Sequence, residues 1–156
     1  YLTGSITYDP LVPPAPDGRF AADVLWFDAF TTNPDRTPRN ANMLEWHGRI
    51  WLIDHGAALY FHHDWADVMA RVADPFERVA QHVLLPFADD VRAADARARE
   101  RLTPGVFESI LADVPDGWLV LGYGVATPEA VRGHYLEYLQ ARLAASSAFV
   151  EEAARG

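Results

Sequence analysis

Residues 19–31, RFAADVLWFDAFT, constrain the fold of this chain more than any other segment. Apolar residues recur along the segment at the spacing of one helical stripe, and further apolar residues fill most of the remaining circumference. A helix that is apolar nearly all round is buried. Pro34 ends the pattern, because the residue before a proline avoids the helical region of backbone space. The sequence therefore predicts a buried helix.

The composition of the 156 residues is that of a folded globular domain, because half of them are apolar. The formal charge is −9 and no basic footprint is present, so we predict that the chain binds no nucleic acid. No apolar run is long enough to span a bilayer and no signal peptide is visible, which favours a cytoplasmic protein that binds no membrane. The absence of cysteine excludes disulfides, thiolate nucleophiles and zinc–thiolate sites.

Turn and helix signals divide the chain into two parts. Residues 1–18 are rich in proline and predict an extended linker, whereas residues 19–156 predict one folded region. Within that region, the turn signal His47-Gly48 between two short apolar runs predicts a β-hairpin that carries Asp54 at the end of its second strand. Helices are expected at 64–72, 75–85, 89–102 and 104–114, and as one long helix from 128 onward. The predicted fold class is mainly α (α+β).

Three polar residues in the loop and hairpin have the spacing of a phosphotransfer site. Asp35 and Asn40 lie five positions apart, and Asp54-His55-Gly56 follows the predicted hairpin. Protein kinases place a catalytic aspartate in the loop H-R-D-x-x-x-x-N and a metal-binding aspartate in the later motif D-F-G. Phosphoryl transfer needs a carboxylate that orients the attacking hydroxyl and oxygen ligands that hold Mg²⁺ against the nucleotide phosphates. The ordered combination predicts this chemistry, although each motif alone also occurs in solvated turns.

A cluster of histidines leaves a metal-dependent hydrolase open as an alternative. His55, His62 and His63 lie near Asp54 in the sequence, and histidine with aspartate is a common set of metal ligands. Adjacent histidines point in different directions on any regular element, and no familiar ligand spacing is present, which disfavours this alternative.

Asp28 carries a charge on the helix that is predicted to be buried. A buried charge must be paired or hydrogen-bonded. We therefore expect Asp28 to brace the catalytic loop, either through Arg36 or through backbone N–H groups.

The segment NPDRTPRN, residues 33–40, resembles the N-T-D-R-x-x-x-N catalytic loop of HipA-type kinases, the toxin kinases of bacterial toxin–antitoxin systems. The longer run of residues 24–63 is similar to the corresponding region of HipA-like kinase-domain proteins. This resemblance implies the C-terminal lobe of a protein-kinase-like fold, in which a small β-hairpin carries the metal-binding aspartate. It also implies transfer of a phosphoryl group from ATP, with Mg²⁺, to a hydroxyl acceptor.

The resemblance implies a role for each residue of the motif. Asp35 would be the catalytic aspartate that accepts or orients the proton of the acceptor hydroxyl. Asn40 and Asp54 would bind Mg²⁺ and through it ATP, with Asp54 bridging the metal and the terminal phosphates. Arg36 would either act in catalysis by stabilising phosphate charge or pair with a carboxylate. Asn33 takes the place of the catalytic-loop histidine of ordinary kinases and would shape the loop.

The chain also departs from the ordinary kinase pattern. His55 replaces the phenylalanine of D-F-G, no A-P-E motif follows, and the chain has neither lysine nor a Gly-rich loop. Because the chain begins at Tyr1 rather than at methionine, we expect a fragment of a longer protein that carries the ATP-binding lobe elsewhere. A catalytically silent interaction module therefore stays open as an alternative. The resemblance implies a protein Ser or Thr as the acceptor, and a small-molecule acceptor stays open. It also implies an antitoxin-like protein or a second copy of the chain as one partner to be expected.

Overall fold

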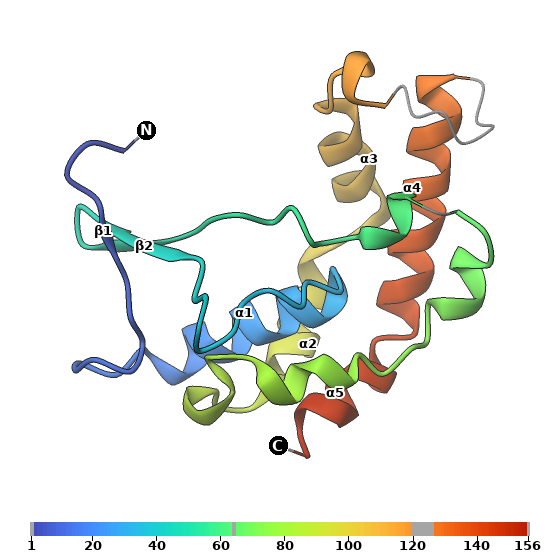
Figure 1. Ribbon diagram of the computed structural model, residues 1–156. Coiled ribbons are helices and arrows are strands. Elements are labelled where there is room, and N and C mark those ends of the chain that lie inside the picture. Colours follow the sequence, from blue (N-terminus) through green and yellow to red (C-terminus); the bar gives the residue numbers. More distant parts are fainter. Residues whose placement is uncertain (1, 64, 120–126, 156) are drawn as a thin grey trace.

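The computed structural model describes residues 2–63, 65–119 and 127–155, without the side chains of His62 and His63 (Figure 1). Helices predominate and a small antiparallel sheet accompanies them, so the fold is mixed α+β, as predicted. The elements are the strands β1 (Ile6–Thr7), β2 (Met43–Trp46) and β3 (Arg49–Leu52), the α-helices α1 (Gly18–Phe30), α2 (Val91–Arg101), α3 (Pro104–Ala112), α4 (Pro128–Ala144) and α5 (Ser147–Ala153), and the 3-10 helices η1 (Tyr60–His63), η2 (Val68–Arg71), η3 (Glu77–Gln81), η4 (Leu85–Phe87) and η5 (Asp116–Trp118).

Helix α1 is buried, as its sequence predicts. The Asp17 side chain caps it by accepting a hydrogen bond from the Phe20 N–H at 2.9 Å, which satisfies one of the free donors of the first turn. The main apolar cluster joins α1 to residues of α2, α4 and α5, and Leu25 and Ala29 are fully buried in it. This enclosure fixes the position of the C-terminal end of α1, from which the predicted catalytic loop departs.

The predicted hairpin is confirmed, and a third strand extends it. Strands β2 and β3 pair antiparallel with Met43 opposite Leu52. The turn residues His47 and Gly48 have φ angles of 51° and 69°, which are the left-handed values of a type I′ turn. Strand β1 pairs with the other edge of β2, so part of the segment predicted as a linker belongs to the sheet. A second apolar cluster, which includes Met43 and Leu84, packs the sheet against α1.

Two of the predicted helices are replaced by short 3-10 helices. Only η2 lies inside the predicted helix 64–72, of which residue 64 is outside the described part, and only η3 and the start of η4 lie inside 75–85. Asp67 and Phe76 have φ angles of 56° and 55°, and a non-glycine residue in the left-handed region interrupts an α-helix. The predictions at 89–102 and 104–114 are confirmed by α2 and α3.

The C-terminal region divides into two helices where one was expected. Helix α4 ends at Ala144 and α5 begins at Ser147. Between them, the buried Ser146 hydroxyl accepts hydrogen bonds from Arg99 Nε and Nη2 at 3.1 and 2.7 Å. Helix α5, which follows this contact, packs against both α1 and α2. Residues 120–126, between η5 and α4, lie outside the described part of the chain.

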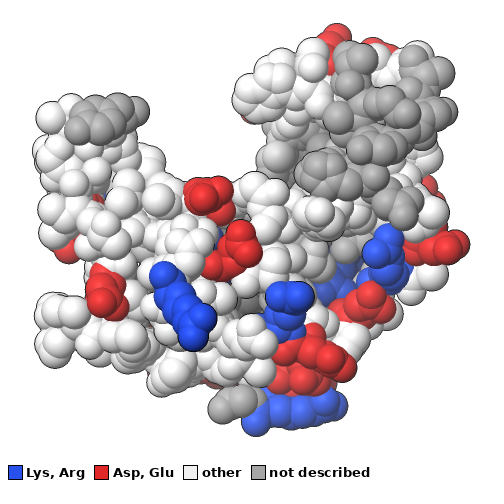
Figure 2. Space-filling model, in the orientation of Figure 1, with Lys and Arg blue, Asp and Glu red and all other residues white. Residues whose placement is uncertain are grey.

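The sheet and the packed pair α3–α4 lie on opposite sides of α1, and the segment after β3 crosses from the sheet toward α4 (Figure 1). Figure 2 shows that the surface is hollowed between these two sides, with acidic side chains exposed on the floor of the hollow. Within the described ranges, no helix combines the length and apolar character needed to cross a membrane.

Candidate active site

The predicted catalytic loop starts at a Schellman turn that ends α1. The Asn33 N–H donates to the Asp28 carbonyl at 2.8 Å, and the Thr32 N–H donates to the Ala29 carbonyl at 3.4 Å. Thr32 takes the left-handed position of this turn with a φ of 55°, where glycine is usual. A β-branched residue is strained there, so contacts beyond the turn must hold it in place. The turn directs the chain into residues 33–40.

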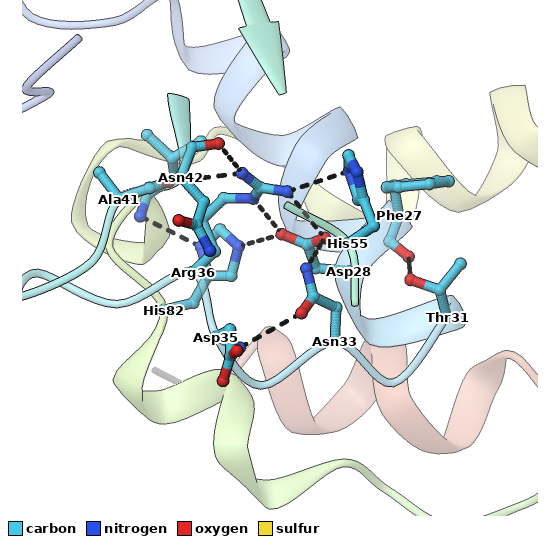
Figure 3. A network of polar contacts seen from close by, with 11 residues as sticks. Phe27, Asp28, Thr31, Asn33, Asp35, Arg36, Ala41, Asn42, His55 and His82 are labelled. Atoms are coloured by element: carbon cyan, nitrogen blue, oxygen red, sulfur yellow. Dashed lines mark hydrogen bonds and ion pairs between the residues drawn. The ribbon is translucent and has the colours of Figure 1, made fainter. Parts of the chain in front are cut away.

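The buried carboxylate of Asp28 supplies those contacts (Figure 3). Arg36 Nε donates to one Asp28 oxygen at 2.5 Å, and Asn33 Nδ2 donates to the other at 3.0 Å. The exposed fractions of Asp28 and Arg36 are 0% and 1%, so water does not weaken the pair. Asn33 Oδ1 also accepts the Asp35 N–H at 3.3 Å. The predictions that Asp28 braces the loop through Arg36 and that Asn33 shapes it are confirmed.

The hydrogen bonds of the network define its charges. The Leu84 N–H donates to His82 Nδ1 at 3.1 Å, so the imidazole is neutral and its Nε2–H donates to Asp28 at 2.9 Å. Burial raises the pKa of Asp28, but hydrogen bonds from His82 and Arg36, the charge of Arg36 and the Asn33 amide together outweigh burial. The pKa of Asp28 therefore lies below its usual 3.8, and the network holds one negative and one positive charge.

The lowered pKa of Asp28 makes stability depend on acidic pH. Its contribution is fully present above the unfolded pKa of 3.8 and is lost as the pH falls through the lower folded pKa. We expect the stability advantage of the wild-type chain over Asp28→Asn to shrink between about pH 5 and about pH 2, as measured by urea unfolding at each pH. An advantage that stays constant over this range would contradict the lowered pKa.

Arg36 also joins the loop to the hairpin. Its Nη1 donates to the carbonyls of Asn42 and Ala41 at 2.6 and 3.3 Å, and its Nη2 donates to His55 Nε2 at 3.3 Å. Arg36 itself, Ala41 and His55 each directly follow one of the predicted site residues, which are Asp35, Asn40 and Asp54. One buried guanidinium therefore contacts the backbone after Asn40 and the side chain that follows Asp54, and its own residue follows Asp35.

Of the two roles open for Arg36, the structure shows the pairing with a carboxylate. The guanidinium is buried against Asp28, and none of it is available to a phosphate group at the surface. Arg36 is thus a positioning residue whose charge is neutralised within the fold. The expectation that Arg36 acts directly on phosphate charge finds no support in this geometry.

The ladder of the hairpin ends close in sequence to both Asn40 and Asp54. The Ile53 N–H donates to the Asn42 carbonyl at 3.0 Å, which extends the ladder of β2 and β3 by one pair, so Asn40 and Asp54 lie two residues and one residue beyond its end. The ladder ends there, because Asn42 and Asp54 have left-handed φ angles of 49° and 52°. Both Asn40 and Asp54 are exposed, so their side-chain oxygens are accessible.

Asp35 lies at a pocket of about 960 Å³ that Asn40 and Asp54 do not line. The Asp35 side chain is exposed, and Figure 3 shows it directed away from Asp28. The pocket is open to solvent, and residues of η1, η2, η3 and α4 line it together with the loop after α1. The structure therefore brings the neighbours of Asn40 and Asp54 into contact with Arg36, and of the three predicted residues Asp35 is the one that lines this pocket.

The donor set suits Mg²⁺ better than a transition metal. Mg²⁺ usually takes one or two carboxylates and completes its shell with waters and substrate phosphates, and the exposed oxygens of Asp54 and Asn40 match that pattern. Within residues 2–63, 65–119 and 127–155, no three His, Cys, Asp or Glu side chains are grouped to bind a metal. The hydrolase alternative thus gains no support, and the His62 and His63 side chains that it would use lie outside the described part.

Two functional candidates were missed by the sequence analysis, namely His82 and Arg142. His82 forms a hydrogen bond with Asp28, which is 54 positions away in the sequence, and it belongs to a segment that was predicted to be helical. Arg142 is fully buried at the pocket, although the last helix was interpreted from its apolar residues alone. A single basic residue among apolar ones carries no periodic signal, so neither position could be found from spacing.

Comparison with protein-family models, curated proteins and solved structures finds no match for this chain. The relation to HipA-type kinases therefore stays a prediction from the resemblance of residues 24–63.

Proposed function

We propose that this chain is a catalytic region of a kinase-type phosphotransferase, which transfers the γ-phosphoryl group of ATP to a hydroxyl group with the help of Mg²⁺. The observation that carries the proposal is the set of contacts of Arg36, which follows Asp35 and donates to the Ala41 carbonyl beside Asn40 and to the His55 side chain beside Asp54. If the loop and the hairpin were unrelated surface turns, they would not need to share contacts with one buried side chain. The resemblance to HipA-type kinases supports the same residue roles.

The three exposed side chains divide the chemistry between them. Asp35 orients the acceptor hydroxyl and takes its proton while the hydroxyl oxygen forms a bond to the γ-phosphorus. The bond from this phosphorus to ADP breaks, and the electron pair leaves with ADP. Asn40 and Asp54 would hold Mg²⁺, which when bound neutralises charge on the phosphate oxygens. Because the chain has no lysine, any cationic side chain that it offers to a phosphate is an arginine or a protonated histidine.

Asp54→Asn is expected to raise the Mg²⁺ concentration needed for half-maximal phosphotransfer. The substitution keeps the size of the side chain and removes the negative charge, on which Mg²⁺ affinity depends. The increase should be at least the roughly 10–100-fold that loss of an outer-shell partner costs a metal site. The measurement is a Mg²⁺ titration of phosphoryl transfer from radiolabelled ATP in the native protein that contains this sequence, with mass spectrometry to find the acceptor.

Asp67→Asn is the matched control for this substitution. Asp67 is exposed and has a φ of 56°, close to the 52° of Asp54, but it lines neither the pocket nor the hairpin. The control should leave the Mg²⁺ dependence unchanged. An Asp54→Asn protein with the Mg²⁺ dependence of the wild type would remove Asp54 from the metal site.

A further inference from the structure

The pocket beside Asp35 has the size and lining of a small-molecule site. Its volume of about 960 Å³ falls within the range of about 300–1,000 Å³ that is usual for such sites. Because Asp35 lines this pocket and neither Asn40 nor Asp54 does, the pocket lies on the acceptor side of the proposed reaction. Aromatic and aliphatic side chains form much of the wall: Tyr60, Phe61, Val68, Phe76 and Tyr138.

Arg142 is a buried cation at this pocket and has no carboxylate partner among the described residues. Its Nη1 donates to the carbonyls of Val72 and Asp74 at 2.8 and 2.6 Å, and its Nη2 donates to the Ala29 carbonyl at 3.0 Å. The Phe149 ring centroid lies 4.5 Å from its Cζ. Its Nε–H has no hydrogen-bond partner within the described part of the chain. A buried donor without an acceptor is costly and needs an explanation, and a ligand of this pocket that accepts a hydrogen bond would supply one.

The remaining charges of the pocket are exposed and of both signs. They belong to Asp35, Arg71, Asp74, Glu77 and Arg78. Exposed charges act through water and are screened by salt, whereas a buried charge acts through a lower effective dielectric. Burial also lowers the pKa of Arg142, which reflects the cost of its charge in this position. Among the described lining residues Arg142 thus carries the buried charge, and the negative charge of Asp74 also acts on it.

We infer that this pocket binds the phosphoryl acceptor, and that the acceptor is a small alcohol with an apolar body and an anionic group. This inference rests on the proposed function. The anionic group, a carboxylate or a phosphate, accepts a hydrogen bond from Arg142 Nε–H, and the apolar body contacts the aromatic walls. The hydroxyl faces Asp35, which takes its proton as the oxygen bonds to the γ-phosphorus and ADP leaves with the electron pair.

Three probes of nearly the same shape test the charge preference on the wild-type chain, without nucleotide. They are 4-(hydroxymethyl)benzoate, 4-(hydroxymethyl)benzamide and 4-(hydroxymethyl)benzylamine, which are anionic, neutral and cationic at pH 7. Calorimetric titration should show the benzoate binding at least about tenfold more tightly than the amide, with the amine weakest. Equal affinities, a preference for the amine, or no binding of the benzoate at roughly 10 mM would overturn the inference.

Two Ala→Phe variants locate the binding. Ala57 lines the pocket, so Ala57→Phe should fill part of it and abolish benzoate binding. Ala73 is exposed and does not line the pocket, so Ala73→Phe should bind benzoate as the wild type does. Circular dichroism and thermal unfolding show whether both variants are folded. If Ala57→Phe does not fold, mapping by saturation-transfer NMR replaces it, with contacts to Tyr and Phe ring protons expected. Benzoate that binds both variants equally, or that gives no such ring contacts, would overturn the inference.

Arg142→Met tests the source of the charge preference. It should bring the benzoate and benzamide affinities to within about twofold, because the variant keeps the bulk of the side chain without its charge. Should this variant fail to fold, the wild-type probe series and Ala57→Phe still decide the outcome.

Failure of the inference can be told apart from failure of the proposed function. Phosphoryl transfer to a Ser or Thr peptide that Ala57→Phe leaves unchanged would overturn the small-molecule acceptor and support the phosphotransferase. Selective benzoate binding with no ATP-dependent transfer to any acceptor would overturn the phosphotransferase, and the acceptor assignment with it, and would leave only an anion-binding pocket.

Discussion

Asp35→Asn is expected to reduce phosphotransfer by roughly 10²–10⁴-fold, because an amide cannot take the proton of the acceptor hydroxyl. The fold should be unaffected, since the Asp35 side chain is exposed and points away from the buried network. Exposed substitutions of this kind usually change stability by no more than about 0.5 kcal/mol. The measurement is the initial rate of phosphoryl transfer in the native protein that contains this sequence, together with the melting temperature of the variant.

Asp113→Asn serves as the control for Asp35→Asn. Asp113 is an exposed aspartate at the C-terminal end of α3 and has no part in the site. It should retain the full rate. A normal rate in Asp35→Asn would sink the assignment of the catalytic aspartate, and a variant that loses both rate and fold would show that Asp35 has a structural role instead.

Asp28→Asn, in contrast to Asp35→Asn, should cause a large loss of stability. Removing the carboxylate charge leaves the buried Arg36 guanidinium without its partner, and breaking a buried ion pair in this way costs about 3–5 kcal/mol. For a chain of this size that corresponds to a fall in melting temperature of roughly 6–20 °C. Urea unfolding at neutral pH measures the change, and activity should fall because Arg36 no longer holds the loop and hairpin together.

Asp23→Asn on the same helix is the matched control. Asp23 pairs with Arg97 at the surface, where the two side chains are 47% and 26% exposed. Surface pairs are worth about 0–1 kcal/mol, so this variant should unfold almost as the wild type does. If Asp28→Asn were no less stable than Asp23→Asn, the buried network would not be what holds the loop.

The local parts of the fold could be predicted from the sequence, and the reason is visible in α1 and the hairpin. The apolar pattern of residues 19–31 and the His47-Gly48 turn each lie within one continuous stretch. Strand β1 is only two residues long and gives no pattern, so its pairing with β2 could not be foreseen. The interruptions at Asp67 and Phe76 also escaped prediction, because apolar spacing does not reveal a left-handed backbone.

In the candidate site too, contacts between residues close in the sequence could be predicted, and contacts between distant segments could not. The pairing of Asp28 with Arg36 could be expected, because the two residues lie eight positions apart and a buried charge needs a partner. The contact of Asp28 with His82 and the position of Arg142 depend on how distant segments pack, which no local pattern records. The pocket is likewise made by η1, η2, η3 and α4 together, and it appears only in three dimensions.

Each predicted site residue is followed by a residue of the Arg36 network, so residues with a structural role and residues with a proposed chemical role are neighbours in the sequence. The buried Arg36 contacts Ala41, which is half-buried, and His55, which is exposed. The side chains at 35, 40 and 54 are exposed as well, and they take no part in this network. Mutation can therefore alter the three exposed residues at small structural cost. A related protein that had lost catalytic activity could change these three residues, but it would still need Asp28 and Arg36 for a stable fold. Among natural variants of this chain, we expect the three exposed residues to be retained where activity is retained. The buried pair Asp28 and Arg36 should be retained wherever the fold is retained.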